Sequence, residues 1–228
     1  MTKPTPLTID IFSDVMCPWC LIGYGQLSKA LEELDGEVEA QLRWRPFELN
    51  PQMAPQGEEQ DAHLAKKYQR SDEERAAIRQ KMKDIADQAG VSLAYEGDGD
   101  APAMMWNTRS AHMLLAWALE EAGPKVQTDL KLALFKAHFN ERRNVSDETV
   151  LLDLAAGVGL HREVAKAALA DEALEARVMA EERQAFEMNI TGVPAMVVSG
   201  KFLIPGAQSP DVYVNALRRV AEKVEAAA

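Results

Sequence analysis

The fold is decided by the run Asp14-Val15-Met16-Cys17-Pro18-Trp19-Cys20-Leu21-Ile22-Gly23, which follows an alternating segment and opens a helical one. Before it, Leu7 to Phe12 alternates apolar and polar side chains, and this pattern predicts a β-strand. From Cys20 to Leu34, apolar residues recur at helical spacing, and Asp35-Gly36 ends that segment. Alternation returns from Val38 to Phe47. A strand, a helix and a second strand in this order predict a βαβ unit and an α/β protein.

The rest of the chain divides into a long helical region and a mixed tail. Residues 53–170 hold a series of helical patterns. One is opened by the capping box Ser71-Asp72-Glu73-Glu74 and ends near Gly90. Another runs from Met104 to Ala122 and ends at Gly123, and Pro124 opens the next helix. The tail predicts a helix, the apolar strand Ala195 to Val198, a returning strand and a final helix. We therefore expect residues 1–52 and 171–228 to form one α/β domain, interrupted by a large all-helical insertion at residues 53–170.

Composition limits the partners and the location. The 228-residue chain has a formal net charge of −11 and no clustered basic patch. A protein this acidic repels phosphate backbones and anionic lipids, so we expect neither nucleic acid nor a membrane as a partner. No apolar stretch approaches the roughly 20 residues that cross a bilayer. The start, Met1 to Pro6, lacks the apolar run of a secretory leader, which predicts a cytoplasmic protein.

The two cysteines of the chain lie three residues apart at the start of the first predicted helix. Helical residues at that spacing have Cα atoms roughly 5 Å apart, which a disulfide tolerates. Cys17 lies where free amides and the positive end of the helix dipole favour a thiolate, so we predict an exposed nucleophile with a low pKa. Cys20, one turn deeper, is the predicted resolving thiol. Pro18 rigidifies the turn without needing an amide partner.

Three other interpretations of the pair are weaker. A zinc site needs four ligands, and the histidines show no ligand spacing with the cysteines, so we predict no metal. Two buried, inert thiols are the second alternative, but the strand-to-helix position and the intervening Pro-Trp favour chemistry. The third alternative is a purely structural disulfide, but a disulfide that closes so short a loop adds little stability. The histidines in question are His63, His112, His138 and His161.

The cysteine run resembles the active site of DsbA-like thioredoxin-fold oxidoreductases, in particular the FrnE-type branch. The similarity continues at matching order and spacing over nearly the whole chain. Its further segments are Arg45-Pro46-Phe47-Glu48-Leu49-Asn50-Pro51, Asn107-Thr108 with Ala111-His112, Gly192-Val193-Pro194-Ala195 and Gly206-Ala207-Gln208. The resemblance implies that the α/β domain is thioredoxin-like, and that the protein exchanges thiols and disulfides with protein or small-thiol substrates.

The resemblance also implies a substrate-binding surface around the cysteines. In thioredoxin-like folds a cis-proline faces the cysteine pair, and Val193-Pro194 takes that place here. The backbone before this proline is then free to pair with an extended substrate. Pro18 and Trp19 complete the expected surface, although Trp19 is equally suited to cap Cys20.

Three further residues carry two interpretations each. Asp14, three residues before Cys17, either raises the thiol pKa or shuttles a proton, or it is an exposed turn aspartate. The resemblance suggests that Asn107 and His112 approach the active-site surface. The alternative is a surface amide and a histidine that packs between helices.

A second enzyme class shares this fold branch. Kappa-class glutathione transferases and 2-hydroxychromene-2-carboxylate isomerases bind glutathione against the cis-proline, but they usually have serine where Cys17 stands. The intact cysteine pair therefore favours thiol–disulfide exchange. Trp19 replaces the histidine of the most oxidising relatives, which implies a milder, more reducing couple. We expect no bound cofactor, with glutathione as an optional co-substrate.

Overall fold

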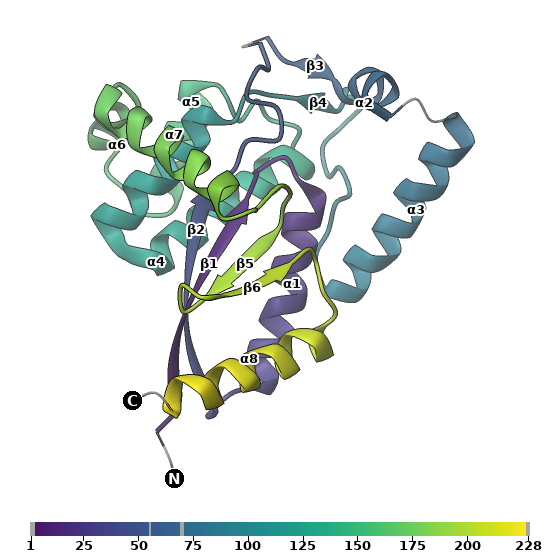
Figure 1. The fold of residues 1–228 in the computed structure, drawn as a ribbon. Coiled ribbons are helices and arrows are strands. Elements are labelled where there is room, and N and C mark those ends of the chain that lie inside the picture. Colours follow the sequence, from purple (N-terminus) through teal and green to yellow (C-terminus); the bar gives the residue numbers. More distant parts are fainter. Residues whose placement is uncertain (1–2, 55, 69–70, 227–228) are drawn as a thin grey trace.

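The computed structural model describes residues 3–54, 56–68 and 71–226. Its elements in chain order are β1 (Thr5–Ser13), α1 (Pro18–Glu33), β2 (Val38–Pro46), β3 (Glu58–Glu59), α2 (Gln60–Tyr68), α3 (Asp72–Ala89), β4 (Met104–Met105), α4 (Arg109–Phe139), α5 (Glu148–Gly157), α6 (Arg162–Leu169), α7 (Glu172–Glu187), β5 (Ala195–Val198), β6 (Phe202–Pro205) and α8 (Pro210–Glu225). The strands form a four-stranded sheet of order β2-β1-β5-β6 and a separate ribbon of β3 with β4 (Figure 1). Within the described ranges, no helix is both long and apolar enough to cross a bilayer.

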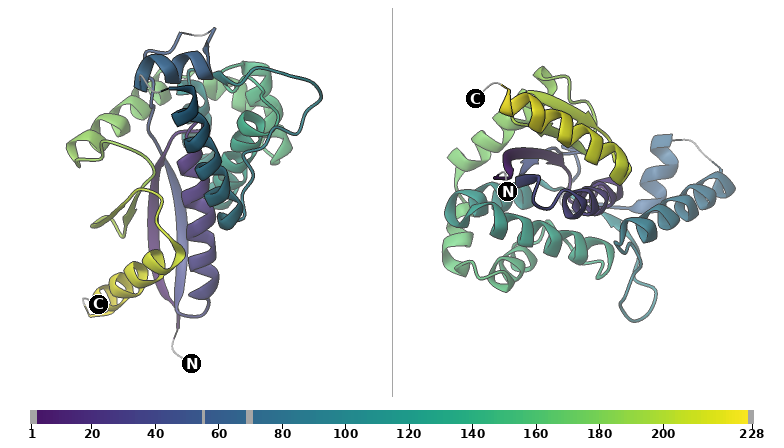
Figure 2. Two further views of the ribbon diagram at one scale, coloured as in Figure 1. Left: turned by 90° about the vertical axis from the view of Figure 1, so that its right-hand side faces the viewer. Right: turned by 90° about the horizontal axis from the view of Figure 1, so that it is seen from below.

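The central sheet is built on β1. It runs parallel to β2, with Ile9 opposite Leu42, and antiparallel to β5, which forms a hairpin with β6. Three alternate side chains of β1, those of Leu7, Ile9 and Ile11, pack in one cluster with apolar residues of α1 and α8. The last helix, α8, lies over β1, whereas α4 runs along β2 (Figure 2). This arrangement confirms the predicted α/β class with a thioredoxin-like core.

The longest helix, α4, is bent where the sequence predicts a break. Gly123 has a φ of 83°, in the left-handed region that glycine tolerates, and Pro124 follows it. The predicted start of this helix at Met104 is wrong. Met104 and Met105 form β4, which pairs with β3, and the helix begins only at Arg109. The insertion is therefore helical except for one short ribbon, which is too short to show as an alternating pattern.

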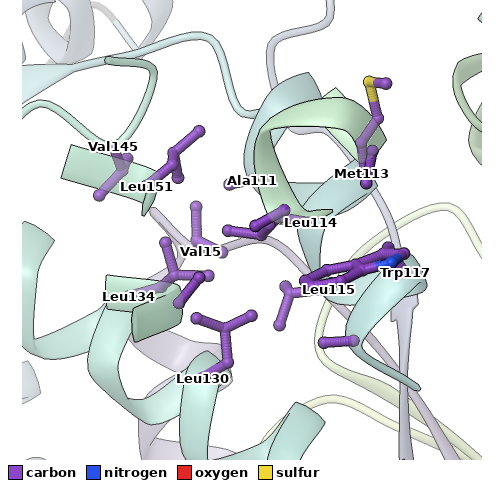
Figure 3. Packing of buried hydrophobic residues seen from close by; sticks show 14 of the residues in the cluster. Val15, Ala111, Met113, Leu114, Leu115, Trp117, Leu130, Leu134, Val145 and Leu151 are labelled. Carbon is purple, nitrogen blue, oxygen red and sulfur yellow. The ribbon is translucent and has the colours of Figure 1, made fainter. Parts of the chain in front are cut away.

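The helices of the insertion surround a second apolar core. Most of its members come from α4, α5 and α6 of the insertion and from α7, which follows it, and Figure 3 shows several of them. Val15, from the turn between β1 and α1, lies among Leu114, Leu134 and Leu151 in this core. The turn that carries the cysteines is thus anchored in the insertion as well as in the sheet.

Helix α7 contacts both parts of the molecule. Leu174 and Val178, in its first half, belong to the core of the insertion. Ala185, near its end, packs with Phe12 of β1. The division between residues 170 and 171 stays a prediction, and its outer limits, residues 1 and 228, lie outside the described residues.

Candidate functional site

The cysteine pair is built by the start of α1. Cys17 is the N-cap residue, with an extended backbone (φ −87°, ψ 111°), and Pro18 occupies the first helical position, where no amide partner is needed. The amide of Cys20 donates to the carbonyl of Cys17 at 3.0 Å, and the two free cysteines come within 3.4 Å of each other. Cys17 is 4% exposed and Cys20 is 0% exposed. The predicted exposure of Cys17 is therefore wrong, because the turn covers its sulfur, but Cys17 is the more accessible of the two.

A loop from the other end of the chain lies against this turn. The Val193-Pro194 peptide bond is cis, and the Val193 carbonyl accepts a hydrogen bond from the Cys17 thiol at 3.7 Å. The Pro194 carbonyl accepts from the Gly206 amide at 2.8 Å. On α1, a Cβ placed on Gly23 would lie 3.0 Å from Pro194 Cγ, closer than nearly all real contacts. Only glycine at this position lets the proline ring approach α1 so closely.

The surface beside this loop is open to a ligand. Residues 189–195, with Leu203, Pro205 and Gly206, line a groove of about 320 Å³. The Trp19 side chain is 38% exposed at the start of α1. The groove shares Val193 and Pro194 with the loop that faces Cys17, and Trp19 is exposed on the turn that carries the cysteines.

Residues 8–218 match the family model described as a DSBA-like thioredoxin domain. The chain belongs to this family. A probable DsbA oxidoreductase of Streptomyces coelicolor is 31% identical in sequence, with a TM-score of 0.81 over 93% of this chain and 89% of that chain. The protein YwbO of Bacillus subtilis is 29% identical over 216 residues, which are 92% of this chain and 94% of YwbO. These matches confirm the predicted family and its enzyme class, thiol–disulfide oxidoreductases of the DsbA type.

A more distant neighbour shares the fold. The cytosolic disulfide reductase DsbM of Pseudomonas aeruginosa, solved with GSH, has a TM-score of 0.63 at 20% identity, over 94% of this chain and 99% of that chain. At this identity the likeness establishes the architecture alone. It is the architecture that the DsbA-like family match also indicates.

Asp14 is a buried anchor in this DsbA-like site. Its carboxylate accepts hydrogen bonds from the amides of Leu49 at 2.7 Å and Met16 at 3.4 Å, and His112 Nε2 lies 3.7 Å away. Burial opposes its ionisation, but the nearby His112 and the hydrogen bond from the Leu49 amide lower the pKa of Asp14 overall. The alternative of an exposed turn aspartate is wrong. Asp14 therefore links the cysteine turn to Leu49, which follows β2, and to His112 of α4.

Asn107 and His112 of the insertion lie in different surroundings in the structure. His112 is buried in the first turn of α4 and reaches the site through Asp14. Asn107 lies before the helix rather than on it. Its side chain accepts from the Arg109 amide at 3.0 Å and donates to the Met53 carbonyl at 3.2 Å. Asn107 therefore shapes the approach to α4, and its hydrogen bonds lead away from the cysteines.

A buried lysine, which the sequence does not single out, lies near the turn that carries the cysteines. Lys131 of α4 is 0% exposed, and its Nζ donates to the Ser13 carbonyl at 3.4 Å. The same Nζ lies 5.2 Å from the ring centroid of Trp44 and 4.9 Å from that of Phe135. The helical pattern of the sequence around Lys131 does not predict that its side chain is buried, because a lysine in such a pattern ordinarily lies in solvent.

The two thiols influence each other's pKa, because a hydrogen bond joins their sulfurs. The hydrogen bond to Cys20, followed by burial, raises the pKa of Cys17 well above its ordinary value. Burial also opposes ionisation of Cys20, yet the hydrogen bond from Cys17, the charge of Lys131, the Ser13 hydroxyl and the Asp14 amide together lower its pKa. The prediction of a lower pKa at Cys17 considered α1 by itself. The hydrogen bond from Cys17 is the largest cause that lowers the pKa of Cys20, and the charge of Lys131 of α4 comes next.

Proposed function

We propose that the protein catalyses thiol–disulfide exchange with Cys17 as the nucleophile and Cys20 as the resolving thiol. The observation that carries the proposal is the position of Cys17, the less buried thiol, against the Val193 carbonyl. A substrate sulfur in the adjacent groove reaches Cys17 before it reaches Cys20. Protein disulfides and small disulfides both suit this site.

The proposed reaction in the reducing direction has two steps. Cys17 loses its proton and attacks one substrate sulfur as a thiolate, so that the substrate disulfide breaks and the other sulfur leaves with the electron pair and takes up a proton. Cys20 then passes its proton to the departing sulfur and attacks Cys17, which forms the Cys17–Cys20 disulfide and frees the second substrate thiol. The substrate gains two electrons and the cysteine pair loses two. Two equivalents of an external thiol restore the reduced pair by the reverse exchange.

We further propose that Pro18, Trp19, Val193 and Pro194 bind the substrate. Trp19 offers an exposed indole surface beside Cys17. Residues 189–195 form one wall of the groove, and an extended substrate can run along their backbone as an added strand does. A substrate that is bound through its backbone needs few particular side chains, so disulfides in varied sequences can bind.

Glutathione is the small thiol that we propose as co-substrate, in a cytoplasmic protein that acts mainly as a reductant. The support is the fold shared with a cytosolic disulfide reductase solved with GSH. Trp19 between the cysteines is neutral, which also supports a more reducing potential of the cysteine pair than that of strongly oxidising relatives. The glutathione-dependent isomerase alternative is less favoured, because both cysteines are present and adjacent.

The test is reduction of insulin disulfides with glutathione or dithiothreitol as the donor, for the wild type, Cys17→Ser and Cys20→Ser. We expect Cys17→Ser to abolish turnover, because it removes the accessible sulfur. Cys20→Ser retains the attack and accumulates a mixed disulfide on Cys17, which mass spectrometry of the intact protein detects. The chain has no other cysteine to confuse the result.

Two outcomes contradict this proposal. Turnover by Cys17→Ser equal to that of the wild type refutes the assignment of the nucleophile. A wild-type reduction potential as oxidising as about −120 mV, the value of a strong periplasmic oxidant, refutes the reducing direction.

A further inference from the structure

The outer strand of the central sheet, β2, leaves part of its backbone unpaired. Among the described residues, β2 has β1 on one side and no strand on the other (Figure 1). The Thr5 amide of β1 donates to the Glu37 carbonyl at 2.9 Å, and in a parallel pair every second residue directs its backbone groups to the neighbouring strand. The residues between these direct their amides and carbonyls outward. They are Val38, Ala40, Leu42 and Trp44.

The outward groups of Trp44 already have a partner. The Gln127 side chain accepts from the Trp44 amide and donates to the Trp44 carbonyl, each at 2.9 Å. In the part of the chain that the structure describes, no group accepts from the outward amides of Ala40 and Leu42. We call Val38 to Leu42 the open edge.

A groove of about 660 Å³ runs along the open edge. It is lined by β2, by Tyr24 of α1, and by Pro124 and Thr128 of α4. Lys125 and Asp129 also line it, and they pair with each other at 2.7 Å, so they add no net charge. The groove lies beside residues 6–8 at the start of β1, whereas the cysteines follow the end of that strand. It is therefore separate from the groove beside the Val193-Pro194 loop.

We propose that the open edge docks the same edge of a second copy of this chain, as an antiparallel strand with Ala40 opposite Ala40. Unpaired amides and carbonyls on an outer strand are a template for a strand of another chain. A two-fold axis makes such a contact self-complementary, because each copy gives and receives the same bonds. The two sheets then join into one continuous sheet.

The side chains and Gln127 select this register. An axis at Glu39 would place that carboxylate opposite its own copy, and like charges directly opposite each other are destabilising. An axis at Gln41 would place Val38 of the second copy against Trp44, where Gln127 already holds the backbone groups. An axis at Ala40 avoids both conflicts. Glu39 then lies opposite Gln41 of the second copy, and the strand contact ends before Gln127.

The backbone groups also agree with an axis at Ala40. Each Ala40 amide donates to the Ala40 carbonyl of the other copy, and each Leu42 amide donates to the other copy's Val38 carbonyl. The Val38 amide needs no partner, because it already donates to the Leu34 carbonyl at 3.1 Å. The pairing therefore uses both free donors of each copy. The small side chain at the axis also leaves room for the two copies to approach.

The competing explanation is an outer strand that stays in solvent. Charged side chains such as that of Glu39 often protect an outer strand of a monomer from pairing. A solvated edge predicts a monomer, and it predicts no effect of the register between Glu39 and Gln41. The inference does not depend on the proposed chemistry of the cysteines.

The experiment measures the dissociation constant of the dimer by sedimentation equilibrium of the whole reduced chain. We expect Gln41→Glu, which places like charges opposite each other twice across the axis, to raise this constant by about twofold to thirtyfold. The double variant Glu39→Gln with Gln41→Glu exchanges the two side chains and should restore the wild-type constant. Both positions are exposed, so the fold is retained. The matched control is Gln88→Glu, which adds the same charge on the exposed side of α3.

A second variant removes the central donor of the contact. Ala40→Pro lacks the outward amide, and an outer strand tolerates proline where its amide faces away from the sheet. We expect it to raise the dissociation constant at least tenfold, because both copies lose a bond and leave a carbonyl unpaired. A wild type that is monomeric at every concentration measured overturns the inference. So does a dimer whose dissociation constant is unchanged in both Gln41→Glu and Ala40→Pro. Neither result bears on insulin reduction, which tests the proposed function separately.

Discussion

A single hydrogen atom, the side chain of Gly23, sets the distance between α1 and the Pro194 loop. A Cβ at this position would lie 3.0 Å from Pro194 Cγ and 3.5 Å from Ala207 Cβ. Both neighbours belong to backbone segments that hydrogen-bond to each other through Pro194 and Gly206. A methyl group at residue 23 requires its neighbours to shift by a few tenths of an ångström, and we expect that shift to move Val193 away from Cys17.

We predict that Gly23→Ala impairs turnover more than stability. Alanine favours the helix by about 0.5–1 kcal/mol, whereas overpacking costs about 1–3 kcal/mol, so the net loss of stability is at most about 2.5 kcal/mol. Displacement of the loop should reduce insulin turnover by about tenfold. Gly157→Ala is the control, because a Cβ there meets nothing within 4 Å. Equal turnover of the two variants shows that the loop position does not govern the reaction.

Functional residues could be predicted from the sequence where the pattern that marks them lies within one short stretch of the chain. Cys17 and Cys20 stand out because a strand, a turn and a helix start are adjacent in the chain, and the resemblance adds Pro194. Lys131 and Gly23 were not singled out, since their importance arises from contacts with residues more than a hundred positions away. The low accessibility of Cys17 escaped prediction for the same reason.

At the scale of elements, prediction succeeded where a pattern was long and capped. The helix after Ser71 has the predicted capping box, with its side chain and that of Glu74 satisfying each other's amides, and it ends at Gly90 with a φ of 78°. The start of α4 was misplaced because Met104 and Met105 are apolar and continue the helical pattern. Their pairing with Glu58 and Glu59 is a tertiary contact, and two residues are too few to show alternation.

A pair of carboxylates joins α7 to the end of β2 and makes this contact sensitive to pH. The Glu48 amide donates to Glu182 Oε1 at 2.8 Å, and the Glu48 side chain pairs with Arg109. Burial, followed by the charge of Glu48, raises the pKa of Glu182 from 4.5 to about 7, although Arg109 opposes the change. The folded protein therefore binds this proton more tightly than the unfolded chain. Stability that is present at low pH is lost as the pH rises from 4.5 to about 7.

We predict that Glu182→Gln removes the loss of stability that Glu182 causes as the pH rises. Glutamine keeps an oxygen for the Glu48 amide and brings a donor for the Glu48 carboxylate, without a charge. Urea unfolding should show the variant more stable than the wild type by about 2 kcal/mol at pH 8, with little difference near pH 4.5. Glu181→Gln is the control, since that partly exposed side chain pairs with Arg45 instead. A difference between Glu182→Gln and the wild type that is the same at both pH values refutes the assignment.

At the scale of the whole molecule, the sheet and the insertion share one interface along β2. Gln127 of α4 behaves like an added strand: its side chain accepts from the Trp44 amide at 2.9 Å and donates to the Trp44 carbonyl at 2.9 Å. Phe135, further along α4, packs in the core of the sheet, with its ring 6.0 Å from that of Trp44. The same stretch of α4 carries Lys131. Loss of this interface therefore removes both the edge protection of the sheet and the buried lysine near the cysteine turn.

We predict that Gln127→Leu destabilises the entire chain in one transition. Leucine fills the space but leaves the amide and carbonyl of Trp44 buried without partners, at about 1–3 kcal/mol each, so the free energy of unfolding should fall by about 2–6 kcal/mol. Circular dichroism, which follows the helices, and tryptophan fluorescence, which includes Trp44 of the sheet, should report the same urea midpoint for the variant. Gln88→Leu on the exposed side of α3 should change stability by less than about 0.5 kcal/mol. Two separated midpoints in Gln127→Leu would show that the sheet and the insertion fold as independent units, because Phe135 and Val15 would then be insufficient to couple the two cores.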